Sequence, residues 1–87
     1  MARLIPAAER ITRARALIQK ARDVPRPVET ALLDLPYMAK VRDLLQQARD
    51  LVKFIPYTPS ATPEMKSQVA EIFMDAEQAE KELLHKH

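Results

Sequence analysis

Apolar side chains recur at alternating intervals of three and four residues in three stretches of the chain. In the first stretch they stand at Ala7, Ile11, Ala14, Ile18 and Ala21. Because an α-helix has 3.6 residues per turn, this spacing gathers the apolar side chains on one side of a helix. We therefore predict a first helix that opens at Pro6 and runs to about Asp23, with Leu17 and Val24 widening its apolar face.

The same spacing appears in two further stretches. The second has apolar side chains at Met38, Val41, Leu45, Ala48, Val52 and Ile55, and the third has them at Met65, Val69, Ile72, Ala76, Ala79 and Leu83. We predict a second helix to about Phe54, which Pro36 either kinks or starts, and a third helix to about Leu84. Leu44 and Leu51 broaden the apolar face of the second helix, which we expect to be the most buried.

Prolines mark the boundaries of these helices, since proline is tolerated in the first turn of a helix and disfavoured inside it. Pro25 and Pro27 end the first helix, and residues 28–35 are expected to form a short extra helical turn. Residues 55–63 contain three prolines and are expected to be a loop without helix. Thr62 is predicted to cap the third helix, with Pro63 as its first residue.

Apolar faces of this spacing are typical of helices that pack nearly antiparallel. The predicted fold is all-α, a three-helix up-down-up antiparallel bundle with a short extra helical turn (28–35) before the second helix. The 87 residues are expected to form one domain, 1–87. A domain of this length buries only about 60–65% of the surface that its unfolded chain exposes, so a partner or a second copy would add to a thin core.

Residues 11–24 resemble residues 38–51, with six identities in fourteen positions. Two interpretations remain open. The likeness is an internal repeat, or it is chance similarity between two amphipathic helices rich in Ala, Leu and Arg.

Composition and motifs argue against an enzyme. The chain has no Cys and no Gly, which excludes disulfides, thiolate chemistry and glycine-rich phosphate loops. Glu82 and His85 match half of a di-iron carboxylate motif, but the other ligands would have to come from a second copy. We predict no catalytic residue, no cofactor and no metal site. No apolar run approaches the roughly 20 residues that span a bilayer. A first helix lying on a membrane surface is the other membrane alternative, but its apolar face is rich in alanine and has no Trp or Phe to anchor it, so we expect no membrane association. The absence of cysteine is compatible with a reducing cytoplasm, and we expect a cytoplasmic protein.

Charge is unevenly distributed along the chain. Residues 1–27 carry seven basic and two acidic side chains, whereas residues 56–87 carry three basic and six acidic ones. The preferred interpretation is that the basic first helix lies beside the acidic third helix. The alternatives are contact with nucleic-acid phosphates or with an acidic protein partner. The basic residues concerned are Arg10, Arg13, Arg15, Lys20 and Arg22.

A second apolar surface is predicted outside the three apolar faces. Met74 lies opposite the apolar face of the third helix, near Ala70 and Phe73, and Phe54 lies outside that of the second. A second contact face indicates self-association, so we predict a non-enzymatic helical protein–protein interaction module that forms a dimer or a larger helical bundle. The alternative function is a small nucleic-acid-binding protein that uses the basic first helix.

Overall fold

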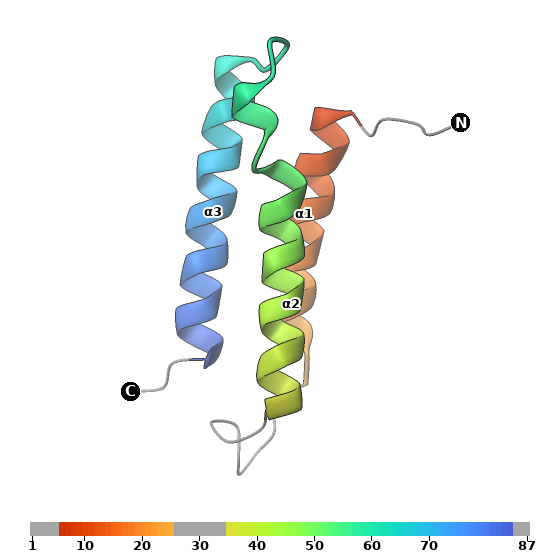
Figure 1. Ribbon diagram of the computed structural model, residues 1–87. Coiled ribbons are helices and arrows are strands. Elements are labelled where there is room, and N and C mark those ends of the chain that lie inside the picture. Colours follow the sequence, from red (N-terminus) through yellow and green to blue (C-terminus); the bar gives the residue numbers. More distant parts are fainter. Residues whose placement is uncertain (1–5, 26–34, 85–87) are drawn as a thin grey trace, which may run out of the picture.

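Three helices pack side by side in the residues that the computed structural model describes, 6–25 and 35–84. They are α1 (Ala7–Asp23), α2 (Leu35–Val52) and α3 (Pro63–Leu84). Each helix contacts the other two, and consecutive helices run in opposite directions (Figure 1). The predicted all-α, three-helix up-down-up bundle is therefore confirmed.

Of the predicted extra turn over residues 28–35, the structure describes only Leu35. Residues 28–34 lie outside the described residues, and Leu35 is the first residue of α2 itself. Pro36 follows in the first helical turn, where a missing backbone N–H removes no intrahelical hydrogen bond. Pro36 is thus compatible with a helix that begins one residue before it.

The predicted cap of α3 is present. The hydroxyl Oγ1 of Thr62 accepts a hydrogen bond from the backbone N–H of Met65 at 3.1 Å. Pro63 is the first residue of the helix, and Glu64 lies in the first turn, where the helix dipole favours an acidic side chain. This bond satisfies one of the backbone donors that have no partner inside the helix.

Two boundaries differ from the sequence prediction. Helix α2 ends at Val52, two residues before the predicted Phe54. The prediction that residues 55–63 contain no helix is wrong at Ile55–Tyr57, which form the 3₁₀-helix η2. Pro56 lies at the start of η2, where the backbone N–H that proline lacks would have no partner inside the helix. At the other end of η2, the backbone N–H and the hydroxyl of Thr58 both donate hydrogen bonds to the carbonyl oxygen of Ile55, at 3.1 and 2.8 Å.

The core contains the central positions of all three predicted apolar faces. The fully or almost fully buried members are Ile11, Ala14, Ile18, Ala21, Val41, Leu45, Ala48, Val52, Ile55, Val69, Ile72, Ala76 and Ala79. Their alanines have no exposed surface, which allows the helix backbones to approach closely. Tyr37 and Leu84 are also buried, although the sequence placed neither of them in a face.

Candidate interaction surface between α1 and α2

The five basic side chains expected to act together on α1 point to different sides of that helix. Two of them reach α3: Arg15 Nη2 lies 3.1 Å from Glu71 Oε1, and Arg22 pairs with Glu82. At these two positions the basic first helix pairs with the acidic third helix, as the charge distribution led us to expect. Arg15 and Arg22 therefore neutralise carboxylates within the bundle and present less free positive charge to a partner.

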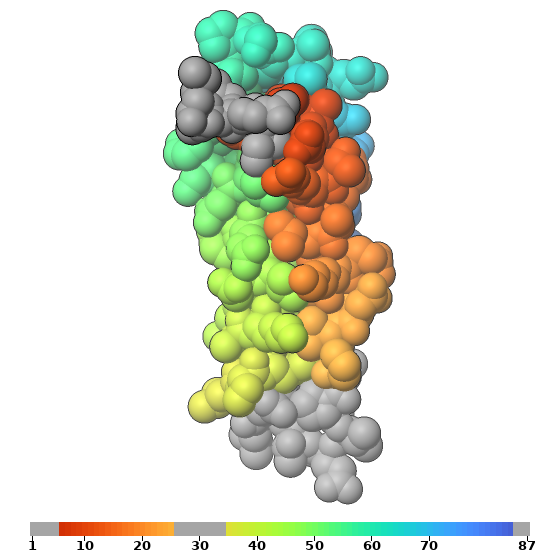
Figure 2. Space-filling model, turned by 90° about the vertical axis from the view of Figure 1, so that its right-hand side faces the viewer, coloured from red at the N-terminus to blue at the C-terminus, as the bar shows by residue number. Residues whose placement is uncertain are grey.

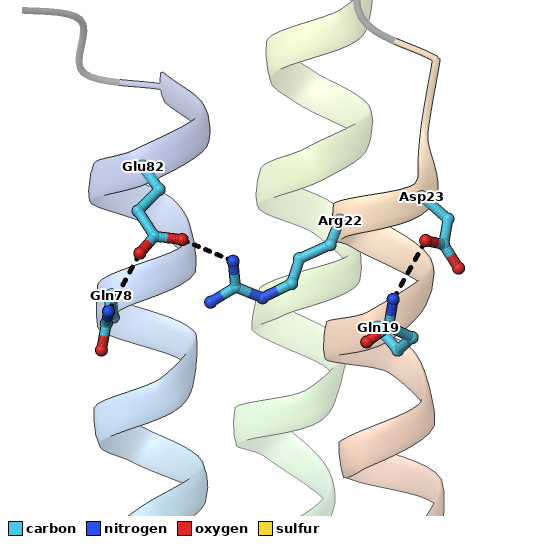
Figure 3. A network of polar contacts seen from close by, with 5 residues as sticks. All are labelled: Gln19, Arg22, Asp23, Gln78 and Glu82. Carbon is cyan, nitrogen blue, oxygen red and sulfur yellow. Dashed lines mark hydrogen bonds and ion pairs between the residues drawn. The ribbon is translucent and has the colours of Figure 1, made fainter.

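Glu82 is the centre of the contact between Arg22 and α3. Figure 3 shows Arg22 extending from α1 across to α3, where Glu82 also accepts a hydrogen bond from Gln78 at 2.9 Å. These two donors stabilise the carboxylate, and the bond from Arg22 is the main reason why the pKa of Glu82 is lowered. Gln19 and Asp23 form a separate 3.0 Å hydrogen bond on another side of α1.

Arg13 and Lys20 lie on the side of α1 that borders α2. Together with Ala16 and Leu17 they line one side of a groove of about 580 Å³. The α2 side of this groove, hereafter the α1–α2 groove, consists of Gln47, Asp50 and Leu51. Figure 2 shows the face on which α1 and α2 lie next to each other.

The groove has an apolar floor and charged edges. Leu17 and Leu51 are half-buried and pack against the core from its outer side. Arg13 and Lys20 supply positive charge along the α1 edge, and Asp50 supplies negative charge along the α2 edge. Such an arrangement suits an amphipathic partner that buries apolar side chains and meets both charges at its margins.

The charged groups at both edges are already held in position by neighbours on their own helices. Arg13 Nη2 lies 2.6 Å from Glu9 Oε2, one turn earlier on α1. Asp50 accepts a 2.9 Å hydrogen bond from Gln46, which is the main reason for its lowered pKa, and Lys53 Nζ lies 3.3 Å away. Both neighbours favour the ionised form of the Asp50 carboxyl group.

Arg10, the remaining member of the predicted basic group, is half-buried near the start of α1. The structure thus distributes the group over the α3 side, the groove side and the N-terminal end of α1. No continuous basic stripe results among these five described residues.

The structure places only some residues of the predicted apolar interface next to one another. Phe73 and Met74 line a shallow hollow of about 260 Å³ with Arg49 and Glu77, between α2 and α3. Phe73 is half-buried against the core, whereas Met74 is 68% exposed. Ala70 is exposed one turn earlier on α3. Phe54 lies beyond the end of α2, is 63% exposed and does not line that hollow. The Nζ atom of Lys53 lies 5.1 Å from the centre of the Phe54 ring.

The α1–α2 groove itself was not predicted as a site. One feature of the sequence could have indicated it: Leu17 and Leu51 widen the apolar faces of their helices. Side chains at the edge of an apolar face lie where the surfaces of two packed helices diverge, and a groove forms there. The sequence could not show that these two leucines border the same depression. Their common location depends on how α1 and α2 face each other.

Other kinds of site find little support in the part of the chain described. Within residues 6–25 and 35–84, no three His, Cys, Asp or Glu side chains are grouped as a metal ion would require. Glu82 of the half di-iron motif is engaged by Arg22 and Gln78, and His85 lies outside the described residues. Among the described helices, none combines the length and the apolar character needed to cross a bilayer.

Comparisons of the chain with protein-family models, with curated proteins and with solved structures give no match.

Proposed function

We propose that this protein is a non-enzymatic helical interaction module whose α1–α2 groove binds a helix of a protein partner. The observation that carries the proposal is the groove of about 580 Å³, with Leu17 and Leu51 at its floor and charged side chains on both edges. Binding sites for amphipathic helices have this combination of an apolar furrow and a polar rim.

The position of the groove in the bundle supports a helical occupant. Two packed helices leave a furrow on each side of their contact, and α3 lies against both α1 and α2 on one side. A further helix in the α1–α2 groove would convert this three-helix arrangement into the four-helix packing that is common among helical bundles. Leu17 and Leu51, half-buried at present, would then be removed from water more completely.

Site-specific photocrosslinking in cells that express the protein tests this function. A photoreactive amino acid replaces Ala16, which is exposed in the groove, and in a matched variant it replaces Ser67, which is exposed on α3. We expect a crosslinked product of one defined mass from position 16 and none from position 67. Mass spectrometry of the product then identifies the partner. Equal labelling from both positions, or no product from position 16, would contradict the proposal.

The alternative function, nucleic-acid binding through α1, receives less support. Arg15 and Arg22 each lie against a glutamate of α3, and Arg13 lies against Glu9. Phosphate binding would have to compete with these ion pairs, which lowers the net gain from each contact. Fluorescence anisotropy with a short DNA duplex at low salt measures this directly.

A further inference from the structure

We propose that the occupant of the α1–α2 groove is the same groove of a second copy of this chain, with the two copies related by a two-fold axis parallel to the helices. This inference rests on the function proposed above and specifies its partner. In the resulting dimer, α1 and α2 of both copies form a central antiparallel four-helix layer, and each α3 lies outside it.

The charges at the two edges of the groove favour a two-fold axis parallel to the helices over one across them. The α1 edge carries Arg13 and Lys20, and the α2 edge carries Asp50. Rotation about an axis parallel to the helices places α1 of one protomer over α2 of its partner, so the basic edge meets the acidic edge. A two-fold axis across the helices would instead place α1 on α1, so that the basic edge of one protomer faces the basic edge of its partner. Opposite charges favour the first arrangement and like charges disfavour the second.

Helix direction agrees with the same arrangement. Helices α1 and α2 are antiparallel within one chain, and a rotation about an axis parallel to them leaves both directions unchanged. Helix α1 of one protomer therefore lies antiparallel to α2 of its partner, which is the usual relation in up-down four-helix bundles. Leu17 and Leu51 of both protomers then face one another across the interface, in an isologous contact.

Charge reversal at Lys20 and Asp50 tests the geometry. Both side chains line the groove, from opposite edges, so the rotation turns Lys20 of one protomer toward the α2 edge of its partner that carries Asp50, and the two-fold axis repeats this pair. Sedimentation equilibrium should show the unaltered protein dimerising at micromolar to millimolar concentrations. Lys20→Glu alone and Asp50→Lys alone should each raise the dimer dissociation constant about tenfold, because both copies of the pair become repulsive.

Mixing the two variants provides the decisive measurement. In a heterodimer of Lys20→Glu with Asp50→Lys, both pairs are attractive again: one joins the two substituted side chains with their signs exchanged, and the other joins the natural Lys20 to the natural Asp50. We therefore expect the mixture to recover a dissociation constant close to that of the unaltered protein. Circular dichroism of each variant must show unchanged helix content, so that loss of association is not loss of folding.

Two further charge reversals serve as matched controls. Lys81→Glu changes net charge as Lys20→Glu does, but at an exposed position on α3, and should leave the dissociation constant unchanged. Glu77→Lys changes net charge as Asp50→Lys does, but lies in the hollow between α2 and α3. If Glu77→Lys weakens the dimer and Asp50→Lys does not, the interface is that hollow and the present proposal is wrong.

The outcomes separate this proposal from the function on which it rests. A protein that stays monomeric throughout the concentration range, yet crosslinks from position 16 to a different protein, retains the proposed function and refutes the second copy as partner. A dimer whose mixed variants show no recovery refutes the two-fold arrangement. A monomer that gives no crosslink from position 16 refutes both.

Discussion

Replacing Ala14 by Leu tests whether α1 packs against its neighbours as closely as the structure indicates. Ala14 has no exposed surface and lies in the middle of the apolar face of α1. Leu and Ala have similar helix propensities, so the effect of the added side chain comes from packing. Inserting it into a filled core costs about 1–3 kcal/mol. A domain of this size has about 4–13 kcal/mol of stability in total, and the loss is therefore readily measured.

Urea unfolding followed by circular dichroism is the appropriate assay, at one fixed protein concentration. With a denaturant slope of about 1 kcal/mol/M, the midpoint for Ala14→Leu should fall by about 1–3 M. Ala8→Leu is the matched control, because Ala8 is exposed on the same helix, does not line the α1–α2 groove, and the same substitution there meets no core. Its midpoint should fall by much less or rise. Equal midpoints for the two variants would refute close packing of α1 at Ala14.

Two further predictions concern individual polar contacts. The pKa of Glu82 is lower in the folded protein than its usual value of 4.5, so its contribution to stability is complete above that pH and disappears as the pH falls through the lowered value. Urea midpoints of the unaltered protein and Glu82→Gln should accordingly differ at pH 7 and converge as the pH falls below the lowered pKa of Glu82. A difference that persists in acid would mean that Glu82 acts through something other than its charge. Thr62→Ala removes the hydroxyl that caps α3 and should cost about 0.5–2 kcal/mol in the same assay. Ser67→Ala, at an exposed position inside α3, is its control, and an equal loss in both variants would exclude the cap as the cause.

The candidate surface changes how the basic character of α1 is interpreted. Sequence alone showed basic side chains on both sides of the apolar face of this helix. The structure assigns Arg15 and Arg22 to glutamates of α3, and it leaves Arg13 and Lys20 beside the α1–α2 groove. The first pair helps to determine which helices are neighbours. The second borders the groove, where Lys20 can orient a partner and Arg13 is held by Glu9.

Local chemistry explains which features were predictable. The positions of the helices follow from a 3.6-residue period, and the period can be read along one segment without knowledge of any other. Thr62 and Pro63 are recognisable as the start of α3 because a cap involves only neighbouring residues. The η2 turn was missed, since three prolines in nine positions suggested a loop although Pro56 is compatible with the start of a 3₁₀-helix.

The sequence by itself therefore determined the helices, their apolar faces and the cap of α3. Only the tertiary structure decided which side of each helix faces which neighbour. Three helices with the same apolar faces can be arranged around one core in either of two hands, and the buried positions are nearly the same in both. The hand adopted here places Arg15 against Glu71 and leaves Arg13 with Leu17 and Leu51 at the α1–α2 groove. The opposite hand would exchange these neighbours, so the candidate surface exists only once the helices have packed.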